Sequence, residues 1–89
     1  MPVLSDSESP PMGVEQRLAH HWGDRVAAAR QRSGRSQQSL AHACGVTQQT
    51  VSKVERGEML AGDRLKWALA DALEVAPGEL FAWPARHGT

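Results

Sequence analysis

Four polar side chains between positions 48 and 53 could read the edges of nucleobases: Gln48, Gln49, Ser52 and Lys53. A glutamine amide donates and accepts at once, so it can pair with the N6/N7 edge of adenine through two hydrogen bonds. Lysine can meet guanine O6/N7 or a phosphate, and a serine hydroxyl can contact a base edge or the sugar-phosphate backbone. A short helix that carries these groups on its outer face is suited to the major groove of DNA.

The surrounding sequence predicts the elements that would hold these side chains outward. Residues 37–54, QQSLAHACGVTQQTVSKV, fit two short helices that cross around a tight turn. Ala41 keeps the first helix slim at the crossing, Gly45 suits the left-handed position after it, and Thr47 can cap the second helix. Buried contacts would come from five apolar side chains: Leu40, Cys44, Val46, Val51 and Val54. The alternative is an ordinary helical hairpin in which these residues form only core and turn.

Six further residues are candidates for contacts with DNA phosphates. They lie near the ends of the two short helices: Arg35, Ser36, Gln37, Thr47, Thr50 and Arg56. Ser36 can cap the first of these helices, and Gln37 opens it, where backbone N–H groups already favour a phosphate. Thr47 and Thr50 could also touch a thymine methyl group. For Thr47, a role as a plain helix cap is an equal alternative.

The charge distribution supports a nucleic-acid partner although the net charge of the chain is zero. Residues 14–57 include seven basic and three acidic side chains, which gives a net charge of +4. Residues 1–13 and 58–89 each carry a net charge of −2. The positive segment contains the proposed reading surface, and this local excess is the property that matters for binding DNA.

The 89 residues suffice for one small domain with a modest core. We expect a disordered N-terminal tail over 1–13, a helix-turn-helix domain over 14–83 and a short tail over 84–89. No run of 18 apolar residues predicts a membrane span, and the first residues do not resemble a secretory signal. The single cysteine, Cys44, can form no internal disulfide, which fits a reducing cytoplasm and a role as a small buried hydrophobe.

The expected fold class is all-α, a compact bundle of about five helices. Val14, Leu18, Trp22 and Val26 recur at every fourth residue and predict a first helix over 14–32.

Two further helices are expected after the recognition helix. Asp63 can cap a fourth helix, and Pro77 suits the first turn of a short fifth helix that ends near Phe81. The fourth helix would carry its apolar residues on one face: Leu65, Ala68, Leu69, Ala72 and Leu73.

With these residues in view, the chain resembles the phage repressor and Cro group, often called XRE-like helix-turn-helix regulators. The resemblance runs from about Trp22 to Trp83. It includes RVAAARQRSGRSQQSLAHACGVTQQTVSKVERG, then LKWALADALEV, then GELF, and its most specific pieces are TQQ and ERG. The family fold is lambda-repressor-like, a compact bundle whose third helix is the recognition helix.

This resemblance implies roles for individual residues. Ser36 and Gln37 would clamp the DNA backbone, while Gln48, Gln49 and Lys53 would read the sequence of bases. The family usually begins its first helix near Trp22, so the residues before it would extend that helix at its N-terminus.

The resemblance also implies a partly buried ion pair between Arg30 and Glu55, which would join the first helix to the recognition helix. The chain departs from the family at the loop over 58–63, which is acidic and partly apolar. Many family members carry basic residues there that touch phosphates. Arg56 or Arg64 could substitute for them.

Because those contacts are missing, we expect modest affinity per subunit and a homodimer on a palindromic operator, with half-sites about 34 Å apart. The candidates for the dimer interface are Leu80, Phe81 and Trp83. Trp83 is the better candidate, because Leu80 and Phe81 can complete the core. An exposed stripe formed by Leu18 and Trp22 competes with this C-terminal surface.

No residue pattern predicts catalysis, a metal or a cofactor. His20 and His21 are adjacent, so on a helix they cannot both face one ion, and no Ser/His/Asp set or Gly-rich phosphate loop is present. The favoured interpretation is a sequence-specific transcriptional repressor that binds double-stranded DNA and is associated with the nucleoid. The alternatives are a DNA-binding antitoxin that also binds a protein toxin, and a helical interaction module that binds no DNA. We expect repression to be relieved by a partner protein, by competition or by proteolysis, and not by a small-molecule switch.

Overall fold

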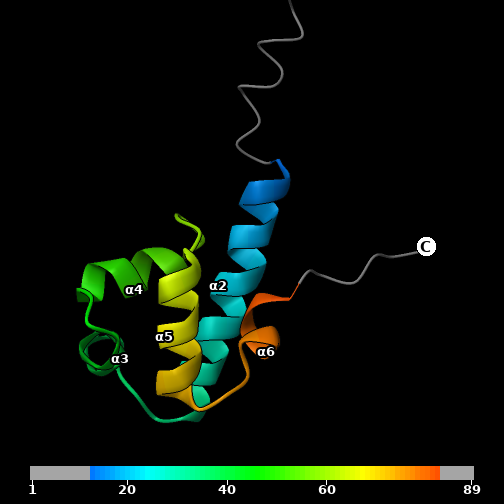
Figure 1. Ribbon diagram of the computed structural model, residues 1–89. Coiled ribbons are helices and arrows are strands. Elements are labelled where there is room, and N and C mark those ends of the chain that lie inside the picture. The colour runs from blue at the N-terminus through cyan, green and yellow to red at the C-terminus, as the bar shows by residue number, and fades with distance from the viewer. Residues whose placement is uncertain (1–12, 83–89) are drawn as a thin grey trace, which may run out of the picture.

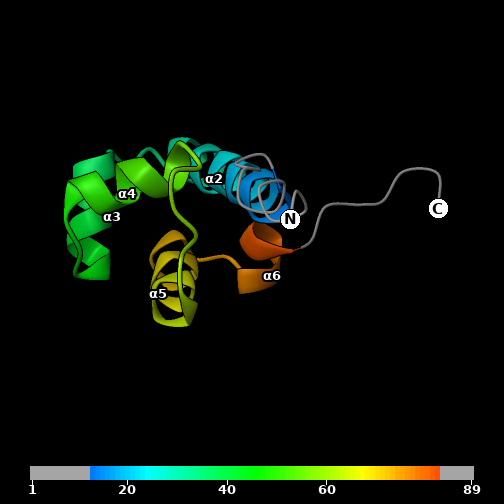
Figure 2. The ribbon, with the colours of Figure 1, turned by 90° about the horizontal axis from the view of Figure 1, so that it is seen from above.

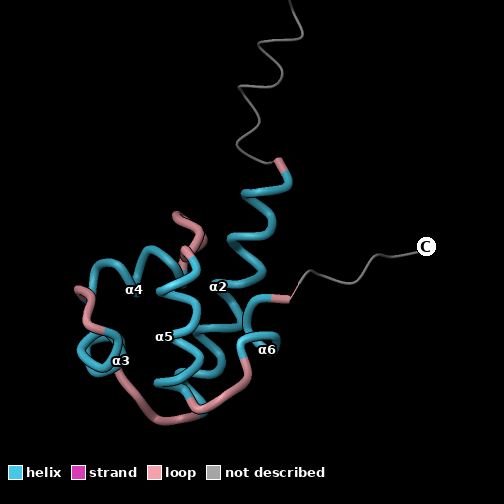
Figure 3. The backbone as a smooth tube through the Cα atoms, in the orientation of Figure 1, coloured by secondary structure: helices cyan, strands magenta, loops and turns pink. Residues whose placement is uncertain are grey.

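The computed structural model describes residues 13–82, and these form five helices and no strand (Figure 1). Loops and turns join the helices without any further regular element (Figure 3). The helices are α2 (Val14–Arg32), α3 (Gln37–Cys44), α4 (Gln48–Glu55), α5 (Asp63–Leu73) and α6 (Pro77–Phe81). The expected all-α bundle of about five helices is therefore confirmed. The expected tails lie outside the described residues, apart from Gly13.

The short helices α3 and α4 form the helix-turn-helix that the sequence predicts. The hydroxyl oxygen of Ser36 accepts a hydrogen bond from the Ser39 backbone N–H at 3.0 Å, and caps α3. Gly45 follows α3 with a φ of 74°, which is left-handed and costs a glycine little. Thr47 caps α4 in the same way, since its hydroxyl oxygen accepts from the Thr50 N–H at 3.2 Å. Both predicted caps and the predicted turn are confirmed.

The predicted cap of α5 is wrong. Gly62 occupies the cap position with extended backbone, no side-chain hydrogen bond is made there, and Asp63 is the first helical residue. The carboxylate of Asp63 still lies in the first turn, where the helix dipole favours a negative charge. α5 ends at Glu74, whose φ is 59°, while the Val75 N–H bonds to the Ala70 carbonyl at 3.0 Å. Val75 packs against the core, so this left-handed ending carries a hydrophobic contact.

The core lies where α2, α3, α4 and α5 meet, and α6 closes one side. Its largest fully buried side chains come from all five helices: Leu40, Leu69, Leu80, Val26 and Val51. From above, α5 lies at the lower edge of the view, with α3 and α4 above it and α6 beside it (Figure 2). No helix in the described part of the chain is long and apolar enough to cross a membrane.

The N-terminal half of α2 packs against α6 through an aromatic contact. The Trp22 and Phe81 rings meet edge to face, with centroids 5.5 Å apart, and the Trp22 indole N–H donates to the Ala82 carbonyl at 2.9 Å. The Lys66 ammonium lies over the Trp22 ring, 4.3 Å from its centroid. The proposed exposed stripe is therefore wrong, because Trp22 and Leu18 are both buried, whereas Val14 is exposed.

Gly23 allows α2 and α4 to approach each other closely. A Cβ atom at this position would collide with the backbone carbonyl oxygens of Val54 and Glu55, and backbone atoms cannot move aside as a flexible side chain would. The close packing of the recognition helix on α2 thus depends on the absence of one methyl group.

We expect Gly23→Ala to destabilise the fold by about 1–3 kcal/mol, because the added methyl group forces α2 and α4 apart. Thermal unfolding followed by circular dichroism measures the effect. Gly78→Ala in α6 is the matched control, since a Cβ there meets no atom within 4 Å. Equal melting temperatures for the two variants would contradict this account of the helix contact.

Candidate nucleic-acid interface

α4 presents its polar side chains to solvent because its apolar residues face the core. Val51 and Val54 are buried, and their spacing of three residues places both on the inner face of the helix. Gln48, Gln49 and Lys53 are exposed. Ser52, the fourth predicted base-reading residue, is half-buried on the same helix. The four predicted base-reading side chains thus lie on one short helix outside its buried face.

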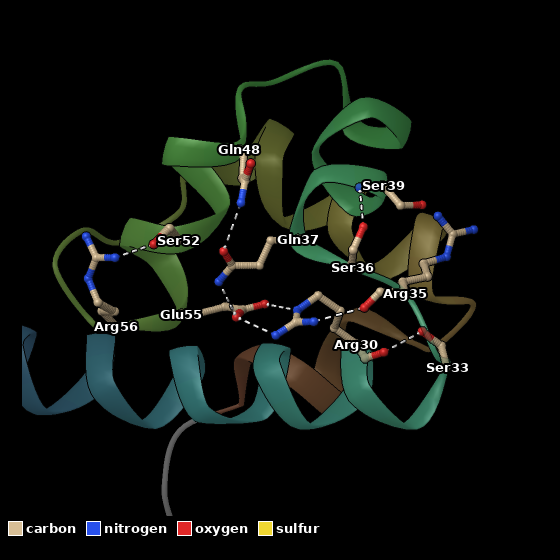
Figure 4. A network of polar contacts seen from close by, with 10 residues as sticks. All are labelled: Arg30, Ser33, Arg35, Ser36, Gln37, Ser39, Gln48, Ser52, Glu55 and Arg56. Atoms are coloured by element: carbon tan, nitrogen blue, oxygen red, sulfur yellow. Dashed lines mark hydrogen bonds and ion pairs between the residues drawn. The ribbon is translucent and has the colours of Figure 1, made fainter.

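A chain of polar contacts leads from α2 to the first of these residues (Figure 4). The Gln48 amide nitrogen donates to the Gln37 side-chain oxygen at 3.5 Å. The Gln37 amide nitrogen donates in turn to the Glu55 carboxylate at 3.0 Å. Gln37 on α3 and Gln48 on α4 point toward one another, although sequence analysis assigned them separate contacts with DNA.

The Glu55 carboxylate is the centre of this network, and Arg30 binds it with two nitrogens. Arg30 Nε donates to Glu55 Oε2 at 2.7 Å, and Nη2 donates to Oε1 at 3.1 Å. The third nitrogen, Nη1, donates to the Arg35 carbonyl at 2.9 Å. The Arg30 and Glu55 side chains are only 14% and 6% exposed. The structure thus joins the two residues whose pairing the family resemblance implies.

The hydrogen bonds that Arg30 donates to the Glu55 carboxylate raise the pKa of Arg30, so the guanidinium keeps its charge despite partial burial. Every nitrogen of the Arg30 side chain has an acceptor, which is the condition under which a buried charge is tolerated. The pair therefore fixes α4 against α2 and orients Gln37 at the same time.

Five of the six predicted phosphate contacts lie at or next to the two helix starts, and Arg56 lies at the end of α4. Ser36 and Thr47 use their hydroxyl oxygens as caps, and the Thr47 and Thr50 hydroxyls lie 3.1 Å apart in hydrogen-bond contact. Ser36 and Thr47 are exposed, whereas Arg35 is half-buried. The exposed starts of α3 and α4 each offer backbone N–H groups that suit a phosphate.

Arg56 is held by a neighbour that sequence analysis did not assign to it. Its Nε and Nη2 donate to the Glu58 carboxylate at 2.8 and 3.0 Å, and its Nη1 donates to the Ser52 hydroxyl. These hydrogen bonds, together with the attraction between the opposite charges, raise the pKa of Arg56 and lower the pKa of Glu58. The opposite charges of Arg56 and Glu58, two residues apart just after the recognition helix, were the feature of the sequence that could have predicted this ion pair.

The helix-turn-helix family pattern matches residues 26–80 of this chain. The chain belongs to the helix-turn-helix family. It is 32% identical over 62 residues to YazB of Bacillus subtilis (strain 168), an uncharacterized HTH-type transcriptional regulator. The aligned residues cover 70% of this chain and 90% of YazB.

Two solved structures show the same arrangement of helices. The restriction-modification controller protein C.AhdI from Aeromonas hydrophila superposes with a TM-score of 0.69 and 35% identity, over 71% of this chain and 96% of that one. The P22 c2 repressor protein, in complex with a synthetic operator, superposes with a TM-score of 0.67 and 28% identity, over the same shares. The resemblance to phage repressors is thereby confirmed.

The family match starts at Val26, within α2, so the first turns of this helix lie before it. These turns contact the end of the recognition helix. The Gln16 amide nitrogen donates to the Gly57 carbonyl at 3.4 Å and lies 3.0 Å from His20 Nε2. A Cβ at Gly57 would collide with the His20 ring. The N-terminal extension therefore supports the turn that ends α4.

The proposed C-terminal dimer surface is only partly available. Leu80 is 2% exposed because it fills the core between the helices, so its proposal as an interface residue is wrong. Phe81 is half-buried against Trp22, and Trp83 lies outside the described residues. The large aromatic residue exposed on the described surface is Trp67, on α5, which sequence analysis missed. Its position between the inward-facing Leu65 and Leu69 was the available signal.

Cys44 packs against the edge of the core and is half-buried. Burial raises the pKa of its thiol, so the thiol stays protonated at neutral pH. This environment fits the packing role expected from the sequence.

We expect Arg30→Met to destabilise the protein by about 3 kcal/mol, because it leaves the Glu55 carboxylate buried without its cation. Denaturant unfolding measures the loss. The double variant Arg30→Met/Glu55→Leu removes both charges and should recover much of it. An unchanged stability for Arg30→Met would show that the pair fixes nothing.

Proposed function

We propose that this helix-turn-helix protein is a sequence-specific transcriptional repressor that acts as a homodimer on a palindromic operator in double-stranded DNA. Each subunit lays α4 in the major groove, and the bound dimer blocks access to a promoter. The protein works on the chromosome, in the cytoplasm and in association with the nucleoid. The observation that carries this proposal is the outward set of amide and ammonium groups on a helix fixed by the Arg30–Glu55 pair.

Base reading falls to the side chains at the exposed end and outer face of α4. Gln48 and Gln49 open the helix and reach deepest into the groove, where each amide can match adenine. Lys53 lies farther along α4 and meets guanine or a phosphate, and Ser52 contacts a base edge or the backbone. Gln48 contacts Gln37 through its amide nitrogen. The side-chain oxygen of Gln48 takes no part in this hydrogen bond and can accept one from adenine N6.

Phosphate binding falls to the exposed starts of the two helices. Ser36 and Gln37 lie at the start of α3, and Thr47 and Thr50 at the start of α4. The backbone N–H groups there and the positive ends of the helix dipoles favour an anion. Arg35 and Arg56 add positive charge at the two edges of this surface.

The proposal agrees with what the related proteins are named for. The P22 c2 repressor is solved in complex with a synthetic operator, C.AhdI is a restriction-modification controller protein, and YazB is an uncharacterized HTH-type transcriptional regulator. A protein antagonist or a toxin that binds the repressor could relieve repression.

Selection of DNA sites from a random pool, followed by gel shifts at two salt concentrations, tests the function directly. A repressor of this kind selects one motif with two-fold symmetry and loses affinity steeply as salt rises. Failure to enrich any motif, together with no salt-sensitive binding, would overturn the proposal and favour a protein-interaction module.

We expect Gln48→Ala and Gln49→Ala each to reduce discrimination between the selected operator and a mutated one by roughly 5- to 150-fold, because a bidentate contact with adenine is worth about 1–3 kcal/mol. Gel shifts on both DNAs measure the ratio. The slope of affinity against salt should stay the same, since neither amide neutralises a phosphate. Equal discrimination by the wild-type protein and both variants would remove these residues from base reading.

We expect Glu58→Gln to strengthen binding to all DNA sequences alike, because it releases Arg56 to bind a phosphate. The logarithmic slope of affinity against salt should steepen by about 0.9, the contribution of one added phosphate contact. Titrations over a range of salt concentrations measure it. Glu74→Gln, which removes a carboxylate at the far end of α5, is the control and should leave the slope unchanged. An identical slope for the two variants would mean that Arg56 does not reach the backbone.

A further inference from the structure

The outer face of α5 carries a residue pattern that does not serve the subunit itself. Arg64, Trp67, Ala68 and Asp71 are spaced as i, i+3, i+4 and i+7, so they form one stripe along the helix. Trp67 is 66% exposed, Arg64 and Asp71 are exposed, and Ala68 is half-buried. We call this set the α5 stripe. A tryptophan exposed to this degree loses much of the free energy that burial would give it.

The side-chain charges of the α5 stripe have no partner among residues 13–82. Neither the Arg64 guanidinium nor the Asp71 carboxylate makes a hydrogen bond or an ion pair with any of these residues. In the described part of the chain, α5 packs against α3, α6 and α2, and this packing leaves Arg64, Trp67 and Asp71 exposed. Its surface is therefore available to another molecule.

The α5 stripe is complementary to itself when it is reversed. A two-fold axis between Trp67 and Ala68 would place Arg64 of one helix opposite Asp71 of the other, and the large indole opposite the small methyl group. This is the requirement of an isologous interface, in which the same patch on both subunits must match itself. The two other carboxylates, Asp63 and Glu74, lie outside the stripe at the two ends of α5.

A groove next to Ala68 provides space for the indole of a second copy. It has a volume of about 440 Å³ and runs between the end of α3 and the start of α5. Cys44, Val46, Leu65 and Ala68 form its apolar part, and Asp63 and Arg64 also line it. A tryptophan that fills a groove of the partner is typical of the residues that carry most of the energy of an interface.

We propose that two copies of this chain associate through the α5 stripe, with their α5 helices antiparallel, Trp67 of each copy in the groove of the other, and Arg64 paired with Asp71 across the axis. The assignment of a dimer rests on the proposed function, which needs two subunits on a two-fold site. The choice of surface rests on the exposed stripe and the groove.

Sedimentation velocity of the full chain without DNA tests this interface. The wild-type protein should show reversible dimerisation, and Trp67→Ala should weaken it by at least about tenfold, because buried tryptophans are frequent hot spots. Val14→Ala is the matched control, since Val14 is exposed and apolar but lies on α2. A monomeric wild-type protein, or a dimer that Trp67→Ala leaves unchanged, would overturn the proposal.

A charge exchange gives a second test that folding defects cannot imitate. Arg64→Asp and Asp71→Arg should each weaken the dimer, because each places like charges opposite one another. The double variant restores opposite charges and should restore dimerisation. Each single change puts the charge that the helix dipole favours at its end of α5, so a lost dimer does not reflect a weakened helix. Failure of the double variant to recover would overturn the proposed pairing.

DNA binding separates this inference from the proposed function. If the variants lose dimerisation as expected but no protein selects any DNA motif, the interface stands and the repressor function fails. If the wild-type protein binds its operator but substitutions in the α5 stripe leave its dimerisation unchanged, the function stands and the interface fails.

Discussion

The buried carboxylate of Glu55 is the contact on which the rest of the interface depends. It receives hydrogen bonds from Arg30 on α2 and Gln37 on α3, so three helices meet at one anionic group. A buried ion pair of this kind is weak evidence for net stability, because taking both charges out of water offsets their attraction. Here the pair mainly positions the helices, because it fixes the angle of α4 against α2. Gln37, which is bonded to Glu55, also accepts a hydrogen bond from Gln48, the first exposed residue of the recognition helix.

Close packing and polar contacts act together on the placement of α4. Gly23 lets the backbone of the recognition helix approach α2, and this approach brings Glu55 within reach of Arg30. Just beyond Glu55, the first turns of α2 bond to the Gly57 carbonyl. The C-terminal end of the recognition helix is therefore supported by one long helix. Preorganisation of this kind lowers the entropy that would be lost when side chains order on DNA.

The electrostatic character of the surface comes from distribution and not from net charge. The chain is neutral overall, yet its basic residues gather in the half that contains α3 and α4. Glu58 moderates this surface by forming an ion pair with Arg56. In the proposed repressor, weaker phosphate contacts increase the share of binding that comes from base contacts and from the proposed second subunit. The exposed Trp67 and the unpaired charges on α5 are the features of this fold that suit such a second subunit.

Most of the fold could be predicted from the sequence because it depends on local rules. The helix-turn-helix could be predicted without any tertiary contact. Its local signals are the capping hydroxyls of Ser36 and Thr47, the left-handed Gly45, and the spacing of Val51 and Val54. Local rules gave a wrong cap at Asp63, because Gly62 occupies the cap position. They also gave a wrong exposure for Leu18 and Trp22, because helical periodicity shows which residues share a face but not what covers that face. Only the tertiary structure decided that α6 buries Trp22, that Gln37 joins Glu55 to Gln48, and that Trp67 remains outside, because these depend on which helices meet across long separations in the chain.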